Sequence, residues 1–278
     1  MKCLITGANG YLGRKLVALY KGSTHQVIEV VREPSGHQLG CDLTDVKQVH
    51  HICNLAQPDL IIHCAAFVPR ALKEYENAVL SKKNIWMLEN IISASKAPII
   101  YISSMTVYGE ASIIRRKESD AGNPASEYGK SKYECELLLE KSKRDAMAVR
   151  IPGLFGARQK GLVANLIQSL MQREKPTLPD VPLLWAAINV LDAAEGIFQL
   201  SQSDFKGFNP VNLGYDEVYS INRLIEICED IFDVEIEHRI KHPQFAFDLS
   251  YLTSFSVKLN SNLRTSLLKL KAESHEFI

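Results

Sequence analysis

The chain has 278 residues, of which 46% are hydrophobic and 23% charged, the composition of a globular protein that can bury a core without disulfides or metals. Its 32 Lys and Arg residues balance its 32 Asp and Glu residues, so it lacks the basic character of a nucleic-acid-binding protein. No apolar stretch reaches the roughly 18 residues of a membrane span. We therefore expect neither a nucleic acid nor a membrane as a partner.

The six cysteines give no sign of a metal site or of a disulfide framework. None forms a C-x-x-C pair, and no Cys/His cluster has the spacing of zinc ligands. Most lie in apolar runs, which indicates buried free thiols: Cys3, Cys41, Cys53, Cys64, Cys135 and Cys228. The N-terminus begins with a strand pattern rather than a signal segment. These features predict a reducing, cytoplasmic setting and no bound metal.

Strand and helix patterns alternate through the first half of the chain. Short apolar runs predict strands, and apolar residues at helical spacing predict helices between them. In chain order the predicted elements are a strand at 2–6, a helix at 11–21, a strand at 26–31, a helix from Thr44 or Asp45 through 55, a strand at 59–63, a helix at 76–95, a strand at 98–103, a helix at 126–143 and a strand at 147–151. The alternation predicts an α/β fold with a Rossmann-type, doubly wound parallel sheet.

The second half of the chain is less regular. Further helices are predicted at 162–173, 190–202 and 220–232. Ser220 is a candidate N-cap for the last of these helices, and short strands are expected at 234–240. We expect a Rossmann domain at 1–155, with 185–210 returning to it, and a smaller, mainly substrate-binding C-terminal region at 156–278.

A glycine-rich turn follows the first predicted strand. Gly7, Gly10 and Gly13 have the spacing G-x-x-G-x-x-G, and the predicted helix begins inside this turn. Such glycines allow a tight turn, let the backbone approach a pyrophosphate and let the helix pack close to the strand, while the helix N-terminus attracts the phosphates. The turn therefore predicts a dinucleotide site. The residues expected at the cofactor are Gly7, Asn9, Gly10, Tyr11, Leu12 and Gly13.

The end of the second predicted strand bears on the choice between NAD and NADP. An acidic residue there would bind the ribose 2′-hydroxyl of NAD, but the position falls on Val31, and Glu29 lies earlier and is expected to point elsewhere. Arg32 comes next, and its planar guanidinium suits a 2′-phosphate. NADP is favoured over NAD, although Arg32 is alternatively an ordinary surface residue. Asp42 and Leu43 are candidate contacts of the adenine.

A tyrosine and a lysine four residues apart suggest acid–base chemistry. Tyr128 and Lys132 share one face of a predicted helix, and an ammonium beside a phenol favours the phenolate. Tyr11 and Lys15 have the same spacing. Position separates the two pairs, because Tyr11 lies in the glycine turn and is expected to pack there or line the phosphate site.

Two serines end the fourth predicted strand. Ser103 and Ser104 lie at the carboxyl edge of the sheet, where ligands bind in this type of fold, and a hydroxyl there could hydrogen-bond a substrate carbonyl. Ser103 and Tyr108 are alternatively a polar strand end and a packed aromatic residue. His63, which ends a buried strand, is expected to be structural.

Several segments together resemble the extended short-chain dehydrogenase/reductase family, in its nucleotide-sugar-modifying branch. They occur in the order found in that family and cover roughly residues 1–230. The matching segments are TGANGYLG (6–13), DLIIHCAA (59–66), YISSMTVYG (101–109), YGKSK (128–132) and RIPGLFG (150–156), with weaker matches at INVLDAAEGI (188–197) and FNPVNLGYDEVYSINRLIEI (208–227).

The resemblance implies a role for each matching residue. Ser104 matches the serine that polarises the carbonyl, Tyr128 the proton donor or acceptor, and Lys132 the lysine that tunes the tyrosine and binds the nicotinamide ribose. The small residues expected beside the cofactor are Ala65 and Ala66, and the segment near the nicotinamide is Pro152 and Gly153. Asn84 lies near the position of the family's structural asparagine.

The resemblance also implies a reaction. Hydride transfer with Ser-Tyr-Lys catalysis on a carbonyl or carbinol of a nucleotide sugar is the expectation, by an epimerase or a reductase. Met105 and Thr106 stand where the related dehydratases carry an Asp-Glu pair, which argues against dehydration. One alternative is an NADPH-dependent reductase of a non-sugar ketone or aldehyde. An alternative of another class is an NAD(P)-sensing regulatory protein without catalysis. A homodimer through helices that include the one carrying Tyr128 is implied as well.

Overall fold

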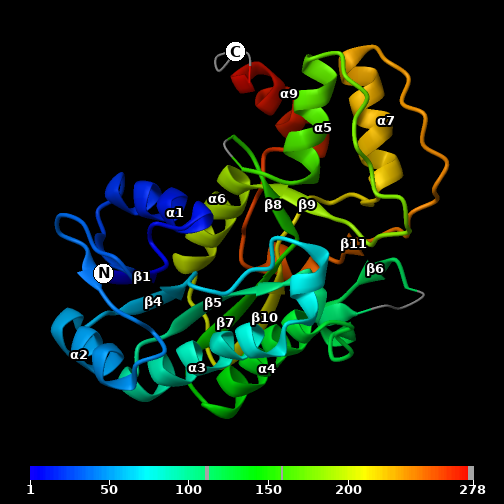
Figure 1. Cartoon of the computed structure of the whole chain (residues 1–278). Coiled ribbons are helices and arrows are strands. Elements are labelled where there is room, and N and C mark those ends of the chain that lie inside the picture. The colour runs from blue at the N-terminus through cyan, green and yellow to red at the C-terminus, as the bar shows by residue number, and fades with distance from the viewer. Residues whose placement is uncertain (110–112, 158, 275–278) are drawn as a thin grey trace.

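A seven-stranded parallel sheet forms the centre of the computed structural model, which describes residues 1–109, 113–157 and 159–274 (Figure 1). All of its neighbouring strands pair in parallel. In spatial order the strands are β10 (Phe208–Asn212), β7 (Ala146–Ile151), β5 (Ile99–Ser104), β4 (Leu60–His63), β1 (Lys2–Thr6), β2 (Gln26–Val31) and β3 (Leu39–Gly40). The predicted fold class, an α/β Rossmann-type doubly wound sheet, is confirmed.

Helices cover both faces of the sheet because its central strands are apolar on both faces. Ile61 packs into one core and Ile62, the next residue of β4, into the other, as expected for a buried parallel strand. On one face lie α1 (Tyr11–Lys21) and α6 (Val190–Ser201). On the other face lie α2 (Val46–Ala56), α3 (Ala78–Ala94) and α4 (Glu127–Lys141).

The other elements of the described residues are short strand pairs, helices and 3₁₀ turns, most of which lie beyond the carboxyl edge of the sheet. The two small parallel pairs are β8 (Gly153–Phe155) with β9 (Ala187–Asn189), and β6 (Arg115–Arg116) with β11 (Ala246–Phe247). The helices are α5 (Leu162–Met171), α7 (Ile221–Phe232), α8 (Ser250–Ser254) and α9 (Leu263–Ser274), with three 3₁₀ turns η1 (Leu72–Glu76), η2 (Met105–Tyr108) and η3 (Glu118–Asp120). Figure 1 shows α5, α7 and α9 grouped together, away from the layer of α2, α3 and α4.

Side-chain caps begin several of the helices, and those of α2 and α7 were predicted. Asp45, and not Thr44, caps α2 by accepting hydrogen bonds from the backbone N–H groups of Lys47 and Gln48. Ser126 caps α4 and Ser220 caps α7 in the same way. Such caps satisfy backbone donors that the first helical turn leaves without a partner.

The expectation of short strands at 234–240 is wrong. That segment has no regular secondary structure, and it is held by side chains instead. His238 and His242 are hydrogen-bonded through their Nε2 atoms at 2.8 Å, and Nδ1 of His242 accepts the backbone N–H of Leu183 at 3.1 Å. A β-like composition does not create a strand where no neighbouring strand offers a partner.

Strand β10 was not predicted, because Pro210 interrupts its pattern. Proline cannot donate to a strand ladder and is tolerated on edge strands. Accordingly, β10 is the edge strand beside β7.

Within the described ranges, no helix has the length and apolar character that crossing a membrane requires.

Candidate functional site at the carboxyl edge of the sheet

The glycine turn brings two backbones into close contact. Gly7 has a φ of +65°, and a Cβ atom added there would lie 2.8 Å from the backbone nitrogen of Ala65, just after β4. A Cβ atom on Gly13 would lie 2.2 Å from the carbonyl oxygen of Gly7. Gly10 donates its N–H to that same oxygen at 2.8 Å. The turn therefore needs glycine, and it leaves Asn9 and Gly10 exposed at the N-terminus of α1.

Polar groups beneath the turn join β1 to β4. The hydroxyl of Thr6 accepts the N–H of Ala65 at 3.2 Å and lies 2.7 Å from Nδ1 of His63. Thr6 is therefore hydrogen-bonded both to the imidazole at the end of β4 and to the backbone that follows it. Burial lowers the pKa of His63 to about 3, and the charge of Lys132 adds to this effect. His63 is thus a neutral residue that helps to align the strand ends.

The neutrality of His63 predicts an acid-sensitive fold. Since its pKa is depressed only in the folded state, the unfolded chain binds the extra proton as the pH falls below about 6.5. This residue alone should lower the free energy of unfolding by about 2 kcal/mol at pH 5 relative to pH 7.5. We expect His63→Asn, which keeps an acceptor for Thr6 but does not titrate, to flatten the pH dependence by that amount in urea unfolding. An identical pH dependence in both proteins would contradict the assignment.

The segment after β4 is clamped by an asparagine. Asn84 of α3 accepts the N–H of Phe67 at 2.7 Å and donates to its carbonyl at 3.2 Å. The same side chain donates to the hydroxyl of Ser131 on α4 at 3.3 Å. These bonds fix the chain that carries Ala65 and Ala66, both half-buried at the edge of the sheet.

Glu29 of β2 is held by polar side chains and is connected through Gln38 to the glycine turn. Its carboxylate pairs with Lys21 at 2.6 Å and accepts from Gln38 at 2.8 Å. Gln38 in turn exchanges two amide hydrogen bonds with Asn9 of the glycine turn. This network connects the turn to the segment before β3.

Arg32 and Asp42 lie near each other beyond β2 and β3. The Asp42 carboxylate accepts the N–H and the hydroxyl of Thr44 at 2.9 and 2.8 Å. These bonds lower the pKa of Asp42, and the charge of Arg32 contributes to the same shift. Arg32 is exposed, whereas the neighbouring Leu43 is buried. An exposed cation thus stands next to the predicted adenine contact.

Ser104, Tyr128 and Lys132 converge on the same edge of the sheet. Ser104 is the last residue of β5, and α4 carries the other two. The Nζ atom of Lys132 donates to the carbonyl of Ile102 at 2.8 Å and lies 5.8 Å from the centroid of the Tyr128 ring. A Cβ atom on Gly129 would lie 2.7 Å from the carbonyl oxygen of Thr106 in η2, so this glycine lets α4 approach the Ser104 segment.

Burial governs the ionisation of this group. Burial raises the pKa of Tyr128, with Tyr75 and Cys135 adding to the rise, while a hydrogen bond with Ser104 opposes it. Burial lowers the pKa of Lys132 to about 8. The pKa of the phenol is therefore raised, where the sequence predicted that Lys132 would lower it, and the phenol is neutral at pH 7.

Tyr75 is a site residue that the sequence did not reveal. Its ring meets the ring of Tyr128 edge to face, with centroids 5.6 Å apart and an angle of 85°. Tyr75 lies in η1, which packs against α4. No motif marks this tyrosine, because its role follows from a contact between segments that are distant in sequence.

A buried ion pair supports the Ser104 segment from below. Glu136 and Arg150 are almost fully buried and form two hydrogen bonds, at 2.6 and 3.0 Å. Ser103 donates to Glu136 at 2.5 Å, and Arg150 donates to the hydroxyl of Tyr108 at 3.0 Å. Tyr108 donates to Asn212 of β10 at 2.5 Å. Ser103 and Tyr108 thus have the packing role that the sequence left open.

Breaking this ion pair should cost much of the protein's stability. Glu136→Gln leaves the guanidinium of Arg150 buried without its counter-charge, a change worth about 3–5 kcal/mol. We expect that loss in urea unfolding. The control is Glu127→Gln on the same helix, which removes the exposed pair with Lys130 and should cost no more than about 1 kcal/mol. Equal losses in both variants would contradict the role of the buried pair.

The other residues expected at the cofactor lie around the same edge. Leu12 is buried in the core, so only its backbone can serve a ligand. Tyr11 is half-buried and donates to the carbonyl of Ala157 at 3.4 Å, which connects the glycine turn to the chain after β8. Pro152 is buried between β7 and β8.

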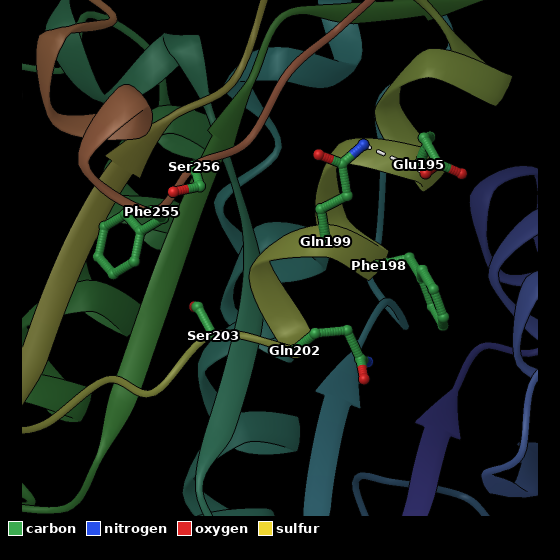
Figure 2. A pocket seen from close by; sticks show the side chains of 7 residues that line it. All are labelled: Glu195, Phe198, Gln199, Gln202, Ser203, Phe255 and Ser256. Atoms are coloured by element: carbon green, nitrogen blue, oxygen red, sulfur yellow. Dashed lines mark hydrogen bonds between the residues drawn. The ribbon is translucent and has the colours of Figure 1, made fainter.

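A surface hollow beside α6 is not part of this site (Figure 2). Helix α6 leads into the parallel strand β10, so its C-terminal end lies at the amino edge of the sheet, opposite the glycine turn. In agreement, His25, just before β2, bonds Gln202 at 2.7 Å. The residues that line the hollow are Glu195, Phe198, Gln199, Gln202, Ser203, Phe255 and Ser256.

Comparisons with known proteins agree with this architecture and place the chain in a class. A Rossmann sheet with a glycine turn and a Tyr-x-x-x-Lys helix at its carboxyl edge defines the extended short-chain dehydrogenase/reductase class. Within it, this chain belongs to the family described as the RmlD substrate binding domain, which matches residues 1–180.

Relatives of two kinds match the chain. The methionine adenosyltransferase 2 subunit beta of Bos taurus is 34% identical over 170 residues, which are 56% of this chain and 47% of that protein. The chain thus spans about half the length of such relatives. A UDP-glucose 4-epimerase of Neisseria meningitidis serogroup C is 24% identical over 90% of this chain and 87% of that protein.

A solved structure shares the whole fold. The UDP-glucose 4-epimerase of Thermus thermophilus, in complex with NAD, superposes with a TM-score of 0.83 at 18% identity and covers 100% of both chains.

Proposed function

We propose that this protein is an NAD(P)-dependent oxidoreductase that acts on a carbonyl or carbinol carbon of a nucleotide sugar, as an epimerase or a reductase. The observation that carries the proposal is the convergence of Ser104, Tyr128 and Lys132 at the sheet edge that also holds the glycine turn. The likeness to UDP-glucose 4-epimerases over nearly the whole chain supports the choice of substrate.

The glycine turn suits a dinucleotide. The close approach of Gly7 to the backbone of Ala65 leaves no room for side chains, and the exposed Asn9 and Gly10 precede the positive N-terminus of α1. These residues would hold the pyrophosphate, and Lys132 would hold the nicotinamide ribose. A bound nicotinamide would supply the site that gives or accepts a hydride.

The chain's own residues would move the proton. A neutral Tyr128 can donate its phenolic proton to a carbonyl oxygen as that oxygen becomes negative, or receive the proton in the reverse direction. The hydroxyl of Ser104 would donate to the same oxygen and hold it in place. Lys132, mostly protonated at pH 7 because its pKa is about 8, would stabilise the phenolate that remains after proton donation.

Tyr128→Phe tests the chemistry directly. The substitution removes one hydroxyl and keeps the ring, so the contact with Tyr75 and the affinity for a dinucleotide should change little. Turnover of UDP-glucose or UDP-galactose should fall by about 10²–10⁴-fold, measured as conversion between the two sugars or as NADPH oxidation with a keto-sugar. Lys132→Met should lower turnover and also weaken dinucleotide binding, since Lys132 serves both.

Tyr11→Phe is the matched control for this experiment. In the unmodified protein, Tyr11 is also followed by a lysine four residues later, but the Tyr11 hydroxyl lies against Ala157 and not against Ser104. At saturating dinucleotide, the turnover of Tyr11→Phe should fall far less than that of Tyr128→Phe, because Tyr11 lies on the cofactor side of the site and away from Ser104. If Tyr128→Phe retained full turnover, or if Tyr11→Phe were equally damaging, the catalytic assignment would be overturned.

Gly10→Val tests the cofactor turn. A Cβ atom at Gly10 would lie 2.9 Å from the carbonyl oxygen of Gly7, and a branched side chain would fill the space where the pyrophosphate approaches the backbone. We expect NADH and NADPH binding to be lost in a fluorescence titration, with circular dichroism showing a retained fold. An unchanged affinity would rule out this turn as the dinucleotide site.

A second candidate function is a dinucleotide-binding subunit without turnover. The observation that favours it is the 34% identity to a protein named as a subunit of methionine adenosyltransferase 2. Purified protein that binds a dinucleotide, yet converts no member of a panel of nucleotide sugars, ketones and aldehydes, would favour this role. The retained Tyr128 and Lys132 favour the enzyme.

A further inference from the structure

We infer that Lys83 of α3 acts with Arg32 as a second cation for the 2′-phosphate of NADP, so that cofactor choice is set from two sides of the sheet edge. This inference rests on the proposed function, because it concerns the adenosine end of the same dinucleotide site. The sequence singles out Arg32 by its place after β2, but it contains no motif that singles out Lys83.

Backbone pairing brings Arg32 and Asp42 to the same end of the sheet. Val31 is opposite Gly40 in the parallel pair of β2 and β3, and the N–H of Cys41 donates to the carbonyl of Val31 at 2.8 Å. This register aligns Arg32 with Cys41, the residue before Asp42, so Arg32 and Asp42 leave the sheet close together at its carboxyl edge.

Helix α3 brings the second cation to the same place. Asn90 donates from its amide to the carbonyl of Leu43 at 2.9 Å, so this face of α3 is turned toward the segment that follows β3. Lys83 precedes Asn90 by seven residues, which is two helical turns, and so shares that face. Because α3 begins after the carboxyl end of β4, Lys83 lies closer to the carboxyl edge of the sheet than Asn90 does. Consistent with this placement, the charges of both Arg32 and Lys83 help to lower the pKa of Asp42.

Both cations are available to an anion. Arg32 and Lys83 are exposed, and among the described residues neither forms an ion pair with a carboxylate. The nearby carboxylate of Asp42 accepts the N–H and the hydroxyl of Thr44 through one of its oxygens, Oδ1. A phosphate monoester bears about two negative charges at pH 7, as phosphorylated side chains do, and a guanidinium with an ammonium matches that charge.

The adjacent lysine provides a matched control. Lys82 has the same charge, the same exposure and the same helix, but its ammonium lies over the ring of Trp86, 5.8 Å from the centroid. Successive residues of a helix point about 100° apart, so Lys82 is directed away from the face that carries Lys83 and Asn90.

The test is a fluorescence titration of NADPH and NADH against the full chain and its variants. Lys83→Ala should weaken NADPH about tenfold and NADH less than twofold, because only NADPH carries the 2′-phosphate. Arg32→Ala should weaken NADPH by about ten- to a hundredfold, and the double variant should bind both cofactors equally. Lys82→Ala should change neither affinity. Competition by 2′,5′-ADP should show the same losses, and competition by 5′-AMP should show none.

The possible failures are distinguishable. If Lys83→Ala weakened NADPH and NADH equally, or no more than Lys82→Ala does, the role of Lys83 would be overturned while the dinucleotide site would stand. Wild-type protein that bound NADH in preference to NADPH would also overturn it. Wild-type protein that bound neither cofactor would overturn the proposed function, and this subsite with it.

Discussion

The contact between the glycine turn and the end of β4 is the constraint on which the site depends. Gly7 takes a positive φ and lies against the backbone of Ala65 so closely that a single methyl group would not fit. The contact places the N-terminus of α1 next to the segment that Asn84 clamps. Backbone N–H groups, free of side chains, are thereby presented at one edge of the sheet, where an anion can approach them.

A second close approach brings Ser104, Tyr128 and Lys132 together at that edge. Gly129 lets α4 come near η2, and the buried pair of Glu136 and Arg150 ties α4 to β7. A buried ion pair contributes little net stability over an apolar pair, but it is strongly destabilising when only one partner remains. Here the ion pair fixes positions. Glu136 accepts a hydrogen bond from Ser103 and so holds the end of β5, with Ser104, beside the helix that carries Tyr128.

Burial gives the group its chemical character. The phenol of Tyr128, covered by Tyr75, stays protonated, while Lys132 is brought to a pKa of about 8. A neutral acid beside a marginally charged lysine suits reversible proton transfer near neutral pH. His63 lies nearby and is kept neutral by its burial and by the charge of Lys132.

The sequence by itself determined the alternation of strands and helices, the helix caps, the glycine turn and the Ser104, Tyr128 and Lys132 set, because each depends on neighbours only a few residues away. The two- and three-residue strands, the proline-containing β10 and the irregular 234–240 segment depend on partners that local patterns do not reveal. Only the tertiary structure decided that Tyr75 covers Tyr128, that Glu136 pairs with Arg150 and that burial raises the pKa of the Tyr128 phenol. The reason is physical: burial, ion pairing and ring contacts depend on segments that are far apart in the chain and come into contact only when the sheet has assembled.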